Sequence, residues 1–186
     1  MLGMAAVSPS DERARNKALL DGQDAIVELI DAGSPLAEVL DSICRLIEEQ
    51  GTGVLCSVLL LDRAGRRLLH GAAPSLPKAY CDVVHGTEIG PNVGSCGAAA
   101  YTGRPCIVED ISTHPNWVAY RELAHVTHGL RACWSTPVHA PDGRVVATFA
   151  MYYRTAKLPT PSERRLTDFS SHLVTLAIER EAERDP

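Results

Sequence analysis

The stretch Gly90-Pro-Asn-Val-Gly-Ser-Cys-Gly-Ala-Ala-Ala-Tyr101 predicts a glycine-rich loop that runs directly into an alanine-rich helix. Gly103 and Pro105 follow it and end that helix. A helix that starts in this way points free backbone N–H groups and the positive end of its dipole at whatever lies before it. The stretch therefore predicts one wall of a site for a small ligand, and the rest of the fold is predicted around it.

Two β-hairpins are predicted, one on each side of this stretch. Each consists of two apolar runs joined by a turn, and the runs are residues 54–61 with 68–73 and residues 132–139 with 145–153. The second hairpin turns through Ala140-Pro-Asp-Gly143, a sequence typical of tight turns. A short strand is expected from Cys106 to Glu109. Strands joined in this way predict a mainly antiparallel sheet.

Long helices are predicted at both ends of the chain, over residues 11–32, 34–51 and 161–184. The last begins with Thr160-Pro-Ser-Glu163, a capping box. Its apolar residues recur at near-heptad spacing, as expected of a helix that pairs with a second copy, and they are Leu166, Phe169, Leu173 and Leu176. The pattern predicts an α+β fold whose sheet is covered by terminal helices on one face. The segment 90–130 is left to cover the other face, with a ligand cavity beneath it.

Composition excludes several classes of protein. With 186 residues, of which 45% are hydrophobic, the chain has the size of one ordinary domain with a real core. The excess of 23 acidic over 18 basic residues gives a net charge of −5, which argues against nucleic acid as a partner. No apolar run approaches the ~18 residues of a membrane span. The N-terminal residues do not resemble a secretory signal, so a cytoplasmic location is expected.

The chain has six cysteines, and none of them forms a Cys-x-x-Cys pair. Their spacing with the histidines therefore predicts no zinc site, and most are expected to be small core residues. No catalytic motif such as a nucleophile elbow, a Walker loop or a dinucleotide fingerprint is present.

Several segments, taken in order and spacing, resemble a known family. They are Val93-Gly-Ser-Cys-Gly-Ala-Ala-Ala-Tyr101, Ile107-Val-Glu-Asp-Ile111, Arg131-Ala-Cys-Trp-Ser-Thr-Pro137, Asp142-Gly-Arg and Thr148-Phe-Ala-Met-Tyr152. Together they resemble a GAF domain of the bacterial signal-transduction type, the kind associated with sensor kinases and cyclic-dinucleotide enzymes. The resemblance covers residues 34–182, including a connector helix over 161–184. Residues 1–33 are then a leader and an additional N-terminal helix.

The resemblance implies a central antiparallel sheet, terminal helices that pack as a homodimer, and a pocket on the opposite sheet face. It also implies an output domain, such as a kinase or a cyclase or phosphodiesterase, in the same signalling system. The family holds ligands as different as cyclic nucleotides, tetrapyrroles and small anions, so neither the ligand nor any cofactor is specified. The expected function is a regulatory, non-catalytic sensor that binds a small molecule or an anion.

Two alternatives remain open. The first is a cysteine-dependent redox enzyme related to the free methionine sulfoxide reductases, whose pattern the run Gly94-Ser-Cys96-Gly97 fits. This chain has Gly86 where those enzymes carry a second cysteine, and no cysteine in the loop where they carry the catalytic one. The second alternative is an unliganded module that serves only for dimerisation.

Seven residues are predicted to bind the ligand. Ser95, Cys96 and Gly97 belong to the helix start, and Trp117 and Tyr120 lie in the segment expected to close the pocket. Arg131 is the cation placed to meet an anionic ligand, and Trp134 lies in the following strand.

Purely structural roles for the same residues stay open as well. Cys96 is either a thiol of lowered pKa or a buried structural residue. Trp117 and Tyr120 are either ligand contacts or anchors into the core. Since side chains alternate along a strand, only one of Cys133 and Trp134 can face the pocket.

Overall fold

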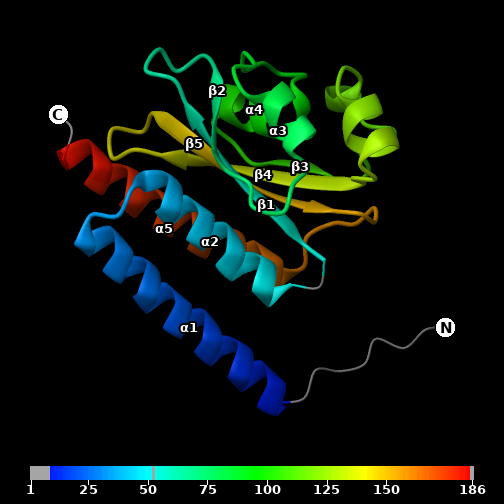
Figure 1. The fold of residues 1–186 in the computed structure, drawn as a ribbon. Coiled ribbons are helices and arrows are strands. Elements are labelled where there is room, and N and C mark those ends of the chain that lie inside the picture. The colour runs from blue at the N-terminus through cyan, green and yellow to red at the C-terminus, as the bar shows by residue number, and fades with distance from the viewer. Residues whose placement is uncertain (1–8, 52, 185–186) are drawn as a thin grey trace.

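A five-stranded antiparallel sheet in the order β2-β1-β5-β4-β3 runs through the middle of the computed structural model (Figure 1). The strands are β1 (Leu55–Leu61), β2 (Leu68–Ala72), β3 (Cys106–Val108), β4 (Ala132–His139) and β5 (Val145–Tyr153). The structure describes residues 9–51 and 53–184, so the predicted leader, residues 1–8, lies outside the described residues. Both predicted hairpins are confirmed, and β1 and β4 flank the central strand β5.

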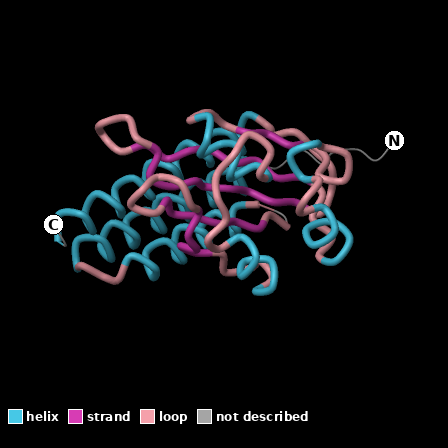
Figure 2. The backbone as a smooth tube through the Cα atoms, turned by 90° about the horizontal axis from the view of Figure 1, so that it is seen from above, coloured by secondary structure: helices cyan, strands magenta, loops and turns pink. Residues whose placement is uncertain are grey.

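Helices cover the two faces of the sheet unequally. The long helices α1 (Pro9–Ala32), α2 (Leu36–Gln50) and α5 (Pro161–Arg184) lie together on one side (Figure 1). The other side carries α3 (Lys78–Val84), α4 (Gly94–Thr102), a 3-10 turn (Pro115–Trp117) and a short π-helix (Glu122–Thr127). Seen from above in Figure 2, these short helices and their loops cross over the strands. The predicted α+β architecture, with terminal helices on one face and the segment 90–130 on the other, is confirmed.

The sheet separates two hydrophobic cores, because successive side chains of a strand point to opposite faces. On β5, Phe149 and Met151 pack against α2 and α5, whereas Ala150 and Tyr152 face the short helices. On β4, Trp134 belongs to the helix-side core and Cys133 to the opposite one. Because side chains alternate, only one of Cys133 and Trp134 can face the short helices, and that residue is Cys133.

The capping box predicted at the start of α5 is present. The Thr160 backbone N–H donates to the Glu163 carboxylate at 2.8 Å, and the Glu163 N–H donates back to Thr160 Oγ1 at 3.3 Å. Glu163 also accepts hydrogen bonds from Lys157 Nζ at 2.6 Å and from Tyr153 Oη at 2.8 Å. This carboxylate therefore fastens the start of α5 to the end of β5.

Leu173 does not have the environment that its heptad spacing predicts. Its side chain is 1% exposed and belongs to the core between α5 and the sheet, so it is not free to meet a second copy. Leu166 and Phe169 remain half-buried and, with Leu19 of α1, line a groove between α1 and α5. The near-heptad pattern arises because one stripe of α5 faces the sheet and an adjacent one faces this groove.

Glycine allows α1 to pack closely on α2. A Cβ atom at Gly22 would lie 2.3 Å from Leu46 Cδ1, so the bare backbone of α1 sits against this leucine. One and two turns later, Ile26 and Ile30 are buried in the same core. Within the described part of the chain, no helix is both long and apolar enough to span a membrane.

Candidate functional site

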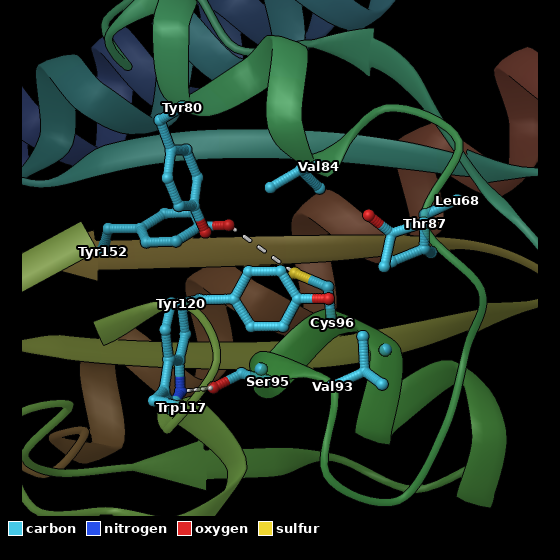
Figure 3. Close-up of a pocket in the computed structure, with 12 residues that line it drawn as sticks. Leu68, Tyr80, Val84, Thr87, Val93, Ser95, Cys96, Trp117, Tyr120 and Tyr152 are labelled. Carbon is cyan, nitrogen blue, oxygen red and sulfur yellow. Dashed lines mark hydrogen bonds between the residues drawn. The ribbon is translucent and has the colours of Figure 1, made fainter. Parts of the chain in front are cut away.

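A small cavity of about 20 Å³ lies between the sheet and the short helices, at the place where the glycine-rich stretch begins α4 (Figure 3). This is about the space of one water molecule, so a larger ligand needs the walls to open. The residues that line it are Leu68, Tyr80, Val84, Thr87, Val93, Gly94, Ser95, Cys96, Gly97, Trp117, Tyr120 and Tyr152. None of these residues is a lysine, arginine, histidine, aspartate or glutamate. Five of the seven predicted ligand residues are among them: Ser95, Cys96, Gly97, Trp117 and Tyr120.

The start of α4 needs its glycines for steric reasons. Gly94 has a positive φ of 55°, which other residues adopt only with strain. A Cβ atom at Gly97 would lie 2.6 Å from Val93 Cβ, so only glycine lets the preceding loop fold back onto the helix. The glycines therefore have two effects. They allow the loop and the helix to pack closely, and they bring the backbone to the cavity wall.

Ser95 connects three parts of the site. Its hydroxyl donates to the Cys133 carbonyl on β4 at 3.0 Å and accepts from Trp117 Nε1 at 3.3 Å. Trp117 is 2% exposed and is thereby fixed to the first turn of α4. The indole is both an anchor and part of the cavity wall.

Hydroxyl groups surround the Cys96 thiol beneath the cavity. Cys96 Sγ lies 3.6 Å from Tyr152 Oη, which accepts a hydrogen bond from Ser57 at 3.3 Å. The hydroxyls of Ser135 and Thr148 face the same thiol, yet neither makes a hydrogen bond of ordinary geometry within the described residues. Figure 3 shows the Tyr80 ring beside Tyr152 and the contact between the Tyr152 hydroxyl and this thiol.

These neighbours set the acidity of the two thiols. Hydrogen bonding from Cys133, together with the nearby polar side chains of Ser135, Tyr152 and Thr148, outweighs burial and lowers the pKa of Cys96. Burial raises the pKa of Cys133, and its hydrogen bond to Cys96 raises it further. Burial likewise raises the pKa of Tyr152, so its hydroxyl stays protonated and available as a donor. Of these groups, Cys96 is the one whose pKa is lowered.

Arg131 does not line the cavity, contrary to its predicted role. Its Nη2 and Nε atoms lie 2.5 and 3.1 Å from the two carboxylate oxygens of Asp110, in a two-pronged ion pair. The guanidinium lowers the pKa of the Asp110 carboxyl far below its usual range. Arg131 thus fastens the loop after β3 to the start of β4. None of the residues that line the cavity is a lysine or an arginine.

Trp134 is the second correction. Its Nε1 donates to the Lys157 carbonyl at 3.1 Å, and its ring packs against Tyr153 with centroids 4.7 Å apart. Both contacts lie on the side of the sheet covered by α5. Strand alternation allowed only one of Cys133 and Trp134 to face the pocket, and the structure places Cys133 on that face.

Two tyrosines of the site were missed by the sequence reasoning. Tyr152 follows Thr148 and Ala150 at a spacing of two along β5, so the alternation that places one of them predicts the same face for all three. Tyr80 lies on the short helix α3 and meets Tyr152 edge to face, with ring centroids 5.9 Å apart. No sequence signal separates Tyr80 from an ordinary surface residue of a short helix.

The histidines of the segment 114–128 hold its backbone. His114 Nδ1 accepts from the Asn116 N–H at 3.2 Å, and His125 Nδ1 lies 3.2 Å from the Leu130 carbonyl. Among the described residues, no group of three or more histidine, cysteine or acidic side chains is arranged to hold a metal ion.

Known proteins resemble the chain in sequence and in fold. A methyl sulfide methyltransferase-associated sensor of Methanosarcina acetivorans is 36% identical over 168 residues, which cover 90% of this chain. The chain spans only 17% of that relative.

Solved structures share the fold at low identity. Free methionine-R-sulfoxide reductase from Neisseria meningitidis has a TM-score of 0.72 at 14% identity, over 99% of this chain and 98% of that one. The GAF domain of a phosphoenolpyruvate-protein phosphotransferase from Coxiella burnetii has a TM-score of 0.70 at 15% identity, over 91% and 98%. At such identities the likeness concerns the fold alone. The GAF domain model, however, matches residues 33–179, which is most of the chain, and the chain therefore belongs to the GAF domain family.

Proposed function

We propose that this GAF domain is a regulatory sensor that binds an uncharged small molecule between α4, the 3-10 turn and the sheet. The observation that carries this proposal is a cavity walled by aromatic rings, whose lining contains no lysine, arginine, histidine, aspartate or glutamate. The family, and a relative whose name describes a sensor, support a sensory role. An anion is disfavoured as ligand because Arg131 is occupied by Asp110.

The walls define the chemistry of the ligand. Trp117 and Tyr120 offer flat apolar surfaces, and Tyr152 and Thr87 offer hydroxyl groups. A planar, mainly apolar molecule with one or two hydrogen-bonding atoms matches this arrangement. Because side chains fill much of the present space, binding requires Tyr120 or Val84 to move outward.

The signal is proposed to pass through β5 to α5. Tyr152 lines the cavity, and its neighbour Tyr153 is bonded to Glu163 at the start of α5. A ligand that shifts β5 would therefore change how α5 is held. We further propose that two cytoplasmic copies pair through α1 and α5 and that α5 continues the signal to an output domain. Residues 1–33 are proposed as the additional helix and 34–182 as the sensor.

The first experiment is native mass spectrometry of the purified protein, compared with its denatured mass and its absorption spectrum. We expect extra mass in the native protein that is lost on denaturation. A bare protein is then screened by thermal shift against neutral planar molecules and against anions of similar size. Stabilisation by anions alone would contradict the proposed ligand class. No shift with any compound would favour the purely structural module.

The pairing of two copies is tested separately. We expect Leu19→Glu combined with Phe169→Glu to give a monomer in sedimentation experiments, because both side chains line the groove between α1 and α5. The control is Leu158→Glu, since Leu158 is an exposed apolar residue outside this groove. A wild-type protein that is already monomeric would contradict the pairing without affecting the ligand proposal.

A further inference from the structure

Two thiols meet beneath the ligand cavity. Cys96 lies in the first turn of α4, and Cys133 lies on β4 with its side chain on the cavity side of the sheet. Cys133 pairs with Tyr152 across the two strands, Tyr152 Oη lies 3.6 Å from Cys96 Sγ, and each thiol shifts the pKa of the other, so the two side chains are neighbours. The neighbouring bond from Ser95 Oγ to the Cys133 carbonyl, at 3.0 Å, holds the backbones of α4 and β4 together at this point.

The two thiols differ in access. Cys96 lines the cavity, whereas Cys133 is fully buried and is not part of the cavity wall. A small molecule that enters the cavity can therefore reach the first sulfur and not the second. This is the arrangement of a reactive thiol backed by a resolving thiol.

A second observation shows that the surroundings of Cys96 are built for more than packing. The hydroxyls of Ser135 and Thr148 are fully buried, face the thiol and have no hydrogen-bond partner of ordinary geometry among the described residues. A buried hydroxyl without a hydrogen-bond partner lowers the stability of the fold. Two such hydroxyls beside one sulfur therefore call for a functional explanation. They can donate to a thiolate, or to an oxygen atom that becomes bonded to that sulfur.

We propose that Cys96 and Cys133 form an oxidisable pair, in which a hydroperoxide that enters the cavity converts the two thiols into a disulfide. The Cys96 thiolate attacks one peroxide oxygen, so that an S–O bond forms, the O–O bond breaks, and the leaving oxygen takes a proton as water or an alcohol. The Cys133 sulfur then attacks the sulfenic sulfur, an S–S bond forms, and the hydroxide that departs takes the Cys133 proton. Two thiols are oxidised, one peroxide is reduced, and no other reactant is needed.

The consequence for the sensor rests on the proposed function, while the oxidation itself does not. A disulfide would tie α4 to β4 and remove the Cys96 hydrogen from its contact with Tyr152 Oη. Since Tyr152 and Cys96 both line the cavity, the ligand would meet a different wall in the oxidised protein.

Another buried pair in the same chain provides a matched control. Cys44 and Cys56 lie in the core under α2, close enough for the charge of one to oppose ionisation of the other. Burial raises the pKa of both, and neither lines the ligand cavity. If burial beside a second cysteine were sufficient for oxidation, this pair would react as well.

The test treats the reduced, full-length protein with a small excess of hydrogen peroxide, blocks the remaining thiols under denaturing conditions, and measures intact mass. We expect a loss of two hydrogen atoms per chain and two thiols protected from blocking, with peptide mapping that joins Cys96 to Cys133. Cys96→Ser and Cys133→Ser should each abolish this product, while Cys44→Ser should retain it. Far-UV circular dichroism and a second set of alanine variants check that each protein is folded.

Three results would overturn the proposal. One is a protein whose six thiols all remain free after oxidation. Another is a disulfide that joins other cysteines, such as Cys96 with the half-buried Cys106. The third is oxygen added to Cys96 without any cross-link to Cys133. Each can occur whether or not the cavity binds a ligand, so any of them would overturn this proposal and leave the sensor proposal standing. Ligand binding by the Cys96→Ser variant, measured separately, tests the sensor proposal alone.

Discussion

Tyr152 and Tyr153 are adjacent on β5 and contact opposite halves of the molecule. Tyr152 Oη lies 3.6 Å from Cys96 Sγ in the cavity wall, and Tyr153 Oη donates to Glu163 Oε1 at 2.8 Å at the start of α5. A displacement of β5 at the cavity would therefore also move the start of α5.

Tyr153→Phe should weaken the attachment of α5 without altering the cavity. The variant loses the hydrogen bond to Glu163, and we expect the free energy of unfolding to fall by about 1–2 kcal/mol, since the acceptor is charged. Urea denaturation measures this change. In the proposed sensor, ligand affinity should stay near the wild-type value, and a large loss of affinity would show that Tyr153 acts on the cavity directly.

Glu163→Ala should cost more than the loss of a single hydrogen bond. The carboxylate accepts bonds from Thr160, Lys157 and Tyr153, so we expect a loss of about 2–3 kcal/mol in urea denaturation. The control is Asp168→Ala, which removes an exposed carboxylate further along α5. Equal destabilisation by the two variants would contradict a special role for the cap.

Trp117→Phe tests the link between the 3-10 turn and α4. Phenylalanine keeps an aromatic ring but cannot donate to Ser95, and we expect a loss of about 1–2 kcal/mol in stability. Ligand binding should weaken as well, because the ring shape in the wall changes. Val118→Ala, at an exposed position beside it, should alter neither quantity. Binding that survives Trp117→Phe and Trp117→Ala unchanged would move the ligand site elsewhere.

Gly97→Ala should disturb the cavity wall by steric overlap. The new methyl group would lie 2.6 Å from Val93 Cβ, and overpacking of this kind costs about 1–3 kcal/mol. Thermal and urea unfolding measure the loss. Adding Val93→Gly removes the opposing Cβ and should restore part of the lost stability relative to Val93→Gly alone. If Gly97→Ala is as stable as the wild type, the loop does not need the close approach.

The Asp110–Arg131 ion pair should affect stability in acid. Because Arg131 lowers the pKa of Asp110 in the folded protein, its stabilising contribution is complete above the unfolded value of about 4 and is lost as the pH falls below it. Asp110→Asn should therefore be less stable than the wild type near neutral pH and approach it in strong acid. A difference that stays constant from pH 7 to pH 2 would mean that the ion pair is not its source.

The sequence predicts the elements of the fold well because their signals are local. Apolar runs predict β1, β4 and β5, and the Thr160–Glu163 capping box places the start of α5 within one residue. Glycines around Gly94 likewise predict the helix start that forms one cavity wall. Each of these features depends on neighbours a few positions away.

The site was predicted less completely, since its other walls depend on contacts between distant segments. Arg131 was expected at the ligand because nothing in the sequence shows that Asp110, 21 positions earlier, takes its guanidinium. Tyr80 meets the cavity through the packing of α3 against Tyr152, a contact across more than 70 positions. Leu173 matched a dimer stripe by spacing alone, although the face of α5 that it occupies is turned to the sheet.

The uncharged lining of the cavity has a consequence for the conditions under which the domain would work. Attraction between a ligand and fixed charges weakens as ionic strength rises, because mobile ions screen it. The lining contains no lysine, arginine, histidine, aspartate or glutamate, so this term is small as long as the Cys96 thiol is protonated. Ligand occupancy should then follow ligand concentration alone and stay the same when the salt content of the surrounding solution changes.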